Sequence, residues 1–198
     1  MSMMLRPLAG VDMQLQRNKV QNLRLATAQI DGILIAPGEI FSLWALIGRP
    51  TRKKGYLDGL VISSGHLGKG VAGGLCQLAN LIHYMVLHTP MKVTELHHHS
   101  DALFPDAGRR VPFGTGTSIV YKNCDYRFQN TTPYPVQIKV WLQDSMLMGK
   151  SVPLQHCKNG IGSKKRTIII PKSQTVITAT AWFIRSYRLR TEKSCKRT

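Results

Sequence analysis

Apolar residues recur every three or four positions after Cys76, and this is the clearest helical pattern in the chain. The apolar positions of this stripe are Leu78, Leu81, Ile82, Met85 and Val86. A Thr-Pro pair at 89–90 marks its end, because proline cannot continue a helix. A second, looser stripe covers residues 12–31 and stops at an Asp-Gly pair. The spacing therefore predicts two main helices.

Short apolar segments bounded by turn residues predict strands in the rest of the chain. These segments are residues 33–35, 41–44, 60–62, 93–99, 117–121, 126–128 and 136–141. Residues 136–141 alternate most regularly between apolar and polar side chains, as a strand with one buried face does. Together the segments predict an α+β fold in which two main helices pack on a small antiparallel or mixed sheet.

A glycine-rich stretch, residues 68–77, leads directly into the helix that is predicted to begin near Cys76. A cysteine at a helix start lies close to unpaired backbone N–H groups and to the positive end of the helix dipole. Both favour the thiolate, which is the form of cysteine that acts as a nucleophile or binds a metal. Cys76 is therefore the candidate nucleophile of the chain.

A histidine-rich stretch that follows the helix supplies candidate partners for this thiol. Side chains alternate along a strand, so His97 and His99 share one face of the strand predicted there. A Cys–His pair also needs a third group that orients the imidazole, and Asp125 at a later predicted hairpin can supply it. The candidate catalytic set is Cys76 as nucleophile, His97 or His99 as base, and Asp125 as the orienting carboxylate.

Candidate substrate-binding groups lie around the glycine-rich turn and in a basic loop. Backbone N–H groups at Gly73 and Gly74 and the side-chain amide of Gln77 can hold an oxyanion. Arg49 and Arg52 belong to a loop that carries four positive charges and can hold a phosphate or an acidic wall polymer. A solvated surface loop is the simpler interpretation of that charge.

Two other interpretations of Cys76 stay open. Free cysteines are often buried, so Cys76 can be a core residue between two leucines. Alternatively, Cys76, His97 and His99 offer three zinc ligands and His83 a fourth, although their spacing matches no standard zinc motif. Without that zinc site, no cofactor is expected.

The net charge of +17 is concentrated toward the C-terminal end of the chain. Residues 1–150 hold 16 Lys and Arg against 9 Asp and Glu, whereas residues 151–198 hold 11 against a single acid, Glu192. Such a shift in composition marks a different kind of segment. Binding to nucleic acid is expected only from this basic tail.

The sequence shows neither a leader nor a membrane span. No apolar run follows Arg6, so the first residues do not have the pattern of a signal peptide. No stretch approaches roughly eighteen consecutive apolar residues, so no transmembrane helix is expected. These features predict a cytoplasmic protein, with association with the cell envelope open if the chain is a fragment.

Several short blocks, taken in their order along the chain, resemble one protein family. The blocks are NLRLA at 22–26, PGEIFS at 37–42, GRPT at 48–51, KGY at 54–56, GGLCQ at 73–77, HS at 99–100, VPFGTG at 111–116 and DYRFQNT at 125–131. They resemble the VanW family over about residues 5–149, whereas residues 150–198 match nothing in it. Two positions depart from the family pattern. Ala72 replaces the first glycine of a triple, and Gly116 stands where the broader family tends to have an aspartate.

The resemblance implies an accessory protein associated with glycopeptide (vancomycin) resistance or cell-wall metabolism, with no defined biochemical activity. The enzymatic hypothesis within that role is Cys–His amide or acyl chemistry on a peptidoglycan-related ligand. The alternative is a non-catalytic binding or structural domain in which Cys76 is buried.

The resemblance also divides the chain. It predicts a VanW-like domain over residues 1–149, truncated at its N-terminus, and a basic tail over residues 150–198. The tail is interpreted as the product of a reading-frame shift or as a disordered segment. A genuine basic appendage that binds nucleic acid or an anionic membrane is the competing interpretation.

Overall fold

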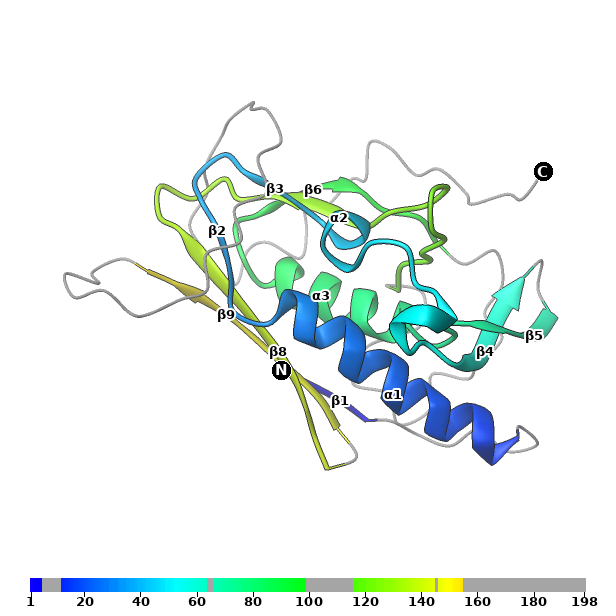
Figure 1. Ribbon diagram of the computed structural model, residues 1–198. Coiled ribbons are helices and arrows are strands. Elements are labelled where there is room, and N and C mark those ends of the chain that lie inside the picture. The colour runs from blue at the N-terminus through cyan, green and yellow to red at the C-terminus, as the bar shows by residue number, and fades with distance from the viewer. Residues whose placement is uncertain (5–11, 64–65, 99–115, 145, 155–198) are drawn as a thin grey trace.

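The computed structural model describes residues 1–4, 12–63, 66–98, 116–144 and 146–154 (Figure 1). The candidate base His99 and the predicted tail beyond residue 154 lie outside these ranges. Helices and small antiparallel sheets make up the described residues, so the predicted α+β class is confirmed for them. None of the helices in these ranges has the length and apolar character needed to cross a bilayer.

Two long helices dominate the described structure, as the periodicity predicts. The helices are α1 (Met13–Ile30), the single-turn α2 (Leu43–Ile47) and α3 (Cys76–Leu87), with a short 3-10 turn at Arg52–Lys54. The strands are β1 (Ser2–Met4), β2 (Ile33–Ile35), β3 (Ile40–Ser42), β4 (Asp58–Ser63), β5 (His66–Val71), β6 (Lys92–Glu95), β7 (Arg127–Gln129), β8 (Val136–Gln143) and β9 (Met146–Pro153).

The strands form three antiparallel sheets. Four strands pair in the order β1-β9-β8-β2, three pair in the order β3-β7-β6, and β4 and β5 form a two-stranded ribbon. In Figure 1 the four-stranded sheet and the three-stranded sheet lie on different sides of α3. The last strand, β9, runs through the predicted domain boundary at residue 149 and continues to Pro153.

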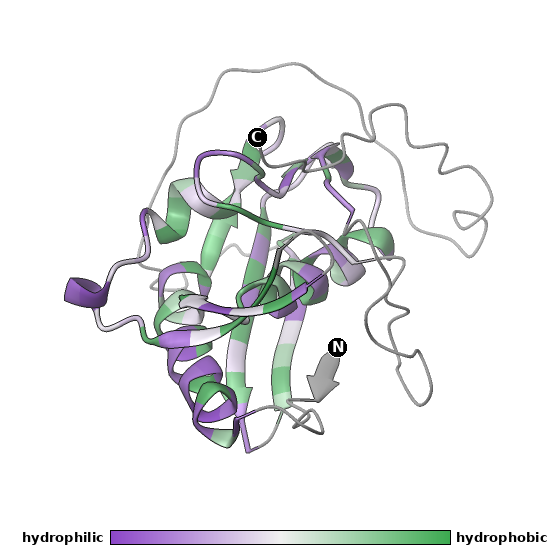
Figure 2. Ribbon diagram, turned by 90° about the vertical axis from the view of Figure 1, so that its right-hand side faces the viewer, coloured by the Kyte–Doolittle hydropathy of each residue, from purple (hydrophilic) through white to green (hydrophobic). Residues whose placement is uncertain are grey.

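Both long helices pack against the four-stranded sheet, α1 on β8 and α3 on β9. In α1 the fully buried positions Leu23, Ala26 and Ile30 recur at helical spacing, and Figure 2 shows hydrophobic and hydrophilic residues alternating along this helix. Such a stripe is what a helix with one buried face requires. At Gly149 of β9 a Cβ would lie 2.7 Å from Sδ of Met85, so the absence of a side chain there lets α3 approach the sheet.

The ends of α1 follow from local chemistry that the sequence already displays. Oδ1 of Asp12 accepts a hydrogen bond from the backbone N–H of Gln14 at 2.8 Å, which satisfies one of the free N–H groups of the first turn. At the other end, Gly32 takes a φ of 79°, a left-handed conformation that glycine adopts without steric cost.

Several elements differ from the prediction. Residues 117–121 were expected to form a strand, but the structure has only an isolated bridge there, between Val120 and Cys124, and the strands β1 and β9 were not predicted. Residues 43–44 were expected to be extended, but they begin α2, because Oγ of Ser42 accepts from the N–H of Ala45 and Oδ1 of the distant Asp125 accepts from the N–H of Trp44. The glycine-rich residues 68–71 were expected to form a turn, but they pair with β4 as part of β5. The helix α2 and the glycine-rich residues of β5 depend on partners elsewhere in the sequence, which a local pattern does not reveal.

The glycine-rich stretch brings two backbones into direct contact. A Cβ on Gly73 would lie 2.2 Å from the carbonyl carbon of Gly59, and a Cβ on Gly59 would lie 2.5 Å from the carbonyl oxygen of Gly73. The buried side chain of Asn22 ties both segments to α1. Its Nδ2 donates to the carbonyl oxygens of Leu57 and Gly73, both at 3.0 Å, and its Oδ1 accepts from the N–H of Leu57 at 2.8 Å.

The residue just before this contact has a backbone conformation that favours glycine. Ala72 has a φ of 62°, in the left-handed region where glycine is strongly favoured over residues with a side chain. Its N–H donates to the carbonyl oxygen of Leu57 at 2.9 Å, which holds the turn in place. The backbone conformation thus favours the glycine that the family resemblance implies at this position, and alanine is the smallest side chain that can replace it.

Replacing Gly73 by alanine is expected to destabilise the protein by roughly 3 kcal/mol or more, because the new methyl group would collide with backbone that cannot move aside. Gly68→Ala in the ribbon is the control, since a Cβ there meets Cγ2 of Val61 at an ordinary 3.6 Å. Urea denaturation of both variants measures the difference. Equal stability of the two variants would contradict the backbone contact.

Candidate functional site

Cys76 is the first residue of α3, as predicted, and it is a free thiol. Burial raises the pKa of this thiol above its ordinary value, and backbone hydrogen bonds with Ile119 and within Cys76 itself only partly offset the effect. The net effect on the pKa is therefore opposite to the predicted preference for the thiolate. Removing the thiol from water disfavours its charged form more than the helix start favours it.

A polar strip of α3 continues from Cys76 through Asn80 to His83, at spacings of four and three residues that place all three on one side of the helix. Oδ1 of Asn80 accepts from the N–H of Thr117 at 2.6 Å. Nδ1 of His83 lies 3.1 Å from the hydroxyl oxygen of Tyr126, and the two rings meet edge to face. These contacts join α3 to the chain that precedes β7.

The segment 117–119 lies between α3 and the histidine-rich stretch. Thr117 and Ile119 bond with α3 through their backbones, whereas the N–H of Ser118 donates to the carbonyl oxygen of His97 at 2.5 Å. Successive N–H groups of an extended chain point to opposite sides, which explains the alternation. The segment therefore places Cys76 and the backbone of His97 on opposite sides of one short stretch of chain.

His97 lies just beyond β6, which ends at Glu95, so the strand predicted over residues 93–99 is shorter in the structure. The side chain of His97 is buried, and its Nε2 lies 2.9 Å from Oε1 of Glu95. Sequence reasoning missed Glu95 as a partner. The signal was present, because residues two apart on an extended chain can lie on the same face.

Glu95 also contacts the segment that leads into β7. Its Oε1 accepts from the N–H of Asp125 at 2.9 Å, and its Oε2 lies 3.2 Å from Nε of Arg127. Burial alone would raise the pKa of Glu95, but the hydrogen bonds from His97 and Asp125 and the positive charge of Arg127 lower it below its ordinary value. The carboxylate is therefore ionised at neutral pH and accepts from both neighbours.

Asp125, predicted to orient a catalytic histidine, has a different set of partners. Its Oδ2 accepts from Oγ of Ser42 at 2.5 Å and from Nε of Arg127 at 2.8 Å. Its Oδ1 accepts from the N–H groups of Trp44 and Tyr126, at 3.1 and 2.8 Å. The buried carboxylate thus caps α2 and joins it to β7, which is a structural role.

These acidic groups gather at one end of the three-stranded sheet. Ser42, Arg127 and Glu95 lie directly opposite one another on β3, β7 and β6. The guanidinium of Arg127 lies between the carboxylates of Asp125 and Glu95, and hydrogen bonding to Asp125 raises its pKa. With the side chain of Arg127 46% exposed, this cluster reaches the surface.

The predicted substrate-binding residues lie in two separate places, around the start of α3 and in the basic loop. The backbone of Gly73 is committed to Gly59 and Asn22, and a Cβ on Gly74 would collide with the side chain of Lys19. Gln77 lies in the first turn of α3 and is partly buried. In the basic loop, Arg49 is exposed, whereas Nη2 of Arg52 binds both carboxylate oxygens of Asp58 at 2.7 and 2.9 Å.

Within the described ranges, no three His, Cys, Asp or Glu side chains come close enough to hold a metal ion. His83, the fourth ligand of the zinc hypothesis, is buried against Tyr126. Burial, and then the charge of His98, lower the pKa of His83 to about 4, so the ring is neutral at physiological pH. Because His99 lies outside the described residues, the predicted three-ligand set stays a prediction.

Comparison with known proteins places these residues in a family context. A family model described as VanW like protein matches residues 18–152. The vancomycin B-type resistance protein VanW of Enterococcus faecalis is 36% identical over 141 residues, which is 71% of this chain and 51% of that protein. The uncharacterized protein YoaR of Bacillus subtilis is 28% identical over 123 residues, which is 62% of this chain and 39% of that protein. The chain therefore spans about half the length of these relatives or less. No solved structure matches it.

Lowering the pH from about 7 to about 4.5 is expected to cost the protein roughly 2–3 kcal/mol of stability through His83. The unfolded chain binds a proton on this ring below about pH 6.5, whereas the folded protein binds it only near pH 4. The contribution of the neutral His83 ring to the stability of the fold is thus fully present above pH 6.5 and declines as the pH falls toward 4.

His83→Gln tests this dependence, because glutamine can still bond with Tyr126 but does not titrate. Urea denaturation at both pH values should show a smaller loss of stability in the variant than in the wild type. The same loss in both proteins would mean that His83 is not held neutral by the fold.

Proposed function

The chain belongs to the VanW family, and on that basis we propose that it is an accessory protein of glycopeptide resistance or cell-wall metabolism. The observation that carries this role is the family match over residues 18–152, which includes most of α1, all of α3 and the strands from β2 to β8. A relative that is 36% identical is named as a vancomycin resistance protein. Because the chain spans about half of that relative, the role of the whole protein is part of the proposal.

Within this role, the domain acts by binding a peptidoglycan-related ligand, and Cys76 is a packing residue at the start of α3. The raised pKa of the thiol supports this assignment, since a neutral thiol is a poor nucleophile. The hydrogen bonds of Asp125 also support a non-catalytic role. That carboxylate accepts four hydrogen bonds from Ser42, Trp44, Tyr126 and Arg127, and it caps a helix.

A second candidate function is amide or acyl chemistry at Cys76, and one observation favours it. Nε2 of His97 lies 2.9 Å from Oε1 of Glu95, as the base of a Cys–His pair would lie beside its orienting carboxylate. In this scheme Sγ of Cys76 attacks the carbonyl carbon while His97 takes the thiol proton. The leaving amine receives that proton, and water then releases the acyl group from sulfur. Glu95 replaces Asp125 as the orienting carboxylate, and His99 stays a candidate base.

Deleting the gene in its own host is expected to lower the minimal inhibitory concentration of vancomycin or to change the muropeptide composition of the wall. Wild-type protein and Cys76→Ala should restore both equally, because a packing cysteine can be replaced by another small apolar residue. Susceptibility testing and liquid chromatography with mass spectrometry of muropeptides provide the two measurements.

Matched variants separate the outcomes of this experiment. If Cys76→Ala and Cys76→Ser are folded and abundant but restore nothing, the thiol chemistry is supported over the binding role. Glu95→Gln should then fail in the same way. If deletion leaves both susceptibility and wall composition unchanged, the accessory role itself is contradicted.

A further inference from the structure

The β4–β5 ribbon has one apolar and cationic face. Side chains alternate along each strand, so Leu67, Lys69 and Val71 of β5 share a face with Leu60 and Ile62, which lie opposite Lys69 and Leu67 on β4. We name these five residues the outer ribbon face. Leu67 is 48% exposed and Val71 is 37% exposed, although both are large hydrophobic residues. An exposed apolar group of this kind marks an interaction surface more often than an isolated side chain does.

The opposite face of the ribbon is partly covered by its own packing. Val61 covers Gly68 and Gly70, with its Cγ atoms 3.6 and 3.2 Å from where a Cβ on each glycine would be. Gly59, on the same side as Val61, contacts the backbone of Gly73. The ribbon is thus fixed to the body of the protein through this side, and Figure 1 shows it extending away from the helices. Leu67 and Val71, the large hydrophobic residues of the ribbon that are exposed, both lie on the outer ribbon face.

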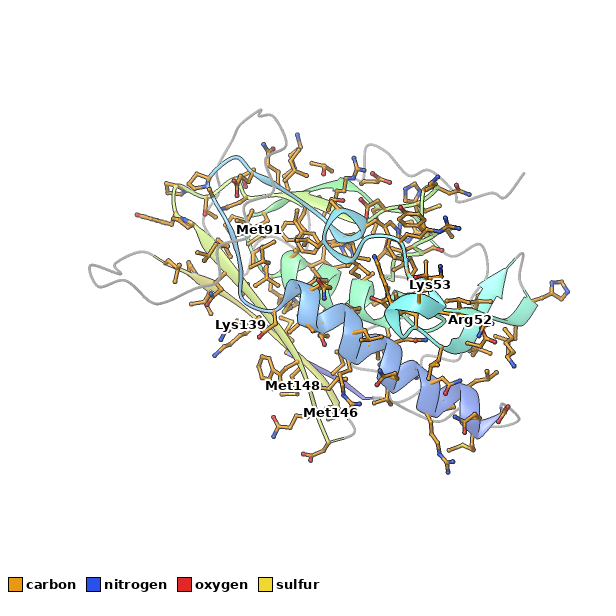
Figure 3. All side chains as sticks on the ribbon, in the orientation of Figure 1. Arg52, Lys53, Met91, Lys139, Met146 and Met148 are labelled. Atoms are coloured by element: carbon orange, nitrogen blue, oxygen red, sulfur yellow. The ribbon has the colours of Figure 1, made fainter. Side chains whose placement is uncertain are left out.

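Positive charge surrounds the outer ribbon face. Residues 49–71 hold five basic residues, Arg49, Arg52, Lys53, Lys54 and Lys69, against the single acid Asp58. Asp58 lies opposite Val71 and binds Nη2 of Arg52 at 2.7 Å, with Nζ of Lys69 at 3.8 Å, so both cations are held at this face. In Figure 3, Arg52 and Lys53 lie beside β4, whereas Lys139 lies on the four-stranded sheet away from the ribbon.

We propose that the outer ribbon face and the adjoining basic loop dock onto an anionic membrane surface. The pattern has the two components that interfacial binding needs: apolar side chains to enter the headgroup region and cations to meet anionic lipids. A soluble polyanion would be bound by the cations alone, and the exposed Leu67 and Val71 would then have no use. This proposal does not depend on the chemistry of Cys76 or on the accessory role proposed above.

Cosedimentation of the full chain with lipid vesicles tests the docking. Binding is expected to vesicles that contain phosphatidylglycerol with phosphatidylcholine, to weaken as salt is added, and to be far weaker on phosphatidylcholine alone. Hydrogen exchange with mass spectrometry then locates the contact. Peptides from residues 58–62 and 66–71 should become protected on the anionic vesicles, whereas peptides from β8 should not.

Two double variants separate the apolar and cationic contributions. Leu67→Glu with Val71→Glu and, separately, Lys53→Glu with Lys54→Glu should each weaken vesicle binding about tenfold or more, because one basic residue near an anionic surface is worth roughly a fivefold factor. Lys139→Glu with Lys150→Glu makes the same charge change on paired residues of β8 and β9 and should have a smaller effect. Circular dichroism confirms that all variants are folded.

Three results would overturn the proposal. The first is vesicle binding in which protection falls outside the ribbon and all variants behave like the Lys139/Lys150 control. The second is equal ribbon protection by soluble inorganic polyphosphate with no effect of the Leu67/Val71 variant, which would make the partner a soluble polyanion. The third is ribbon protection that rises with protein concentration in the absence of lipid, which would assign the face to a second copy of the chain.

Discussion

The backbone contact between Gly59 and Gly73 determines where α3 begins, and most of the structure around Cys76 depends on it. Only two glycines can approach so closely, and the three hydrogen bonds of Asn22 hold the contact against α1. Cys76 follows three residues later as the first residue of α3. The glycine-rich stretch thus serves close packing of two backbones, and it leads into the helix start at which Cys76 lies half-buried.

A second set of long-range bonds builds the end of the three-stranded sheet. Asp125 and Glu95 together accept hydrogen bonds from three different segments, and the guanidinium of Arg127 offsets their charge. Carboxylates held in this way stabilise the folded state, because several hydrogen bonds and an opposite charge compensate for their removal from water. They also fix His97 beside Glu95 and hold α2 against β7. Asp125, one of the residues that look catalytic in the sequence, is therefore engaged in holding the fold together.

The sequence predicts those parts of the fold that depend on local periodicity. The helices α1 and α3 and the strand β8 each display their buried face in the spacing of apolar residues. The single turn α2 and the glycine-rich strand β5 do not, since the first needs the cap from Asp125 and the second needs β4 as a partner. The candidate site is likewise predictable only where it depends on local sequence. The position of Cys76 at a helix start was predictable, but the desolvation that raises its pKa arises from tertiary packing.

The central claim is that the fold keeps Cys76 as a half-buried thiol with a raised pKa, and the pH dependence of its alkylation tests that claim most directly. Iodoacetamide is added to the native protein over a range of pH, and mass spectrometry follows the peptide that contains Cys76, so that the other cysteines do not interfere. The same peptide in the urea-unfolded chain is the reference. We expect slow modification at neutral pH and an inflection above the value of about 8.5 expected for a free thiol. Rapid modification with an inflection clearly below that value would contradict it.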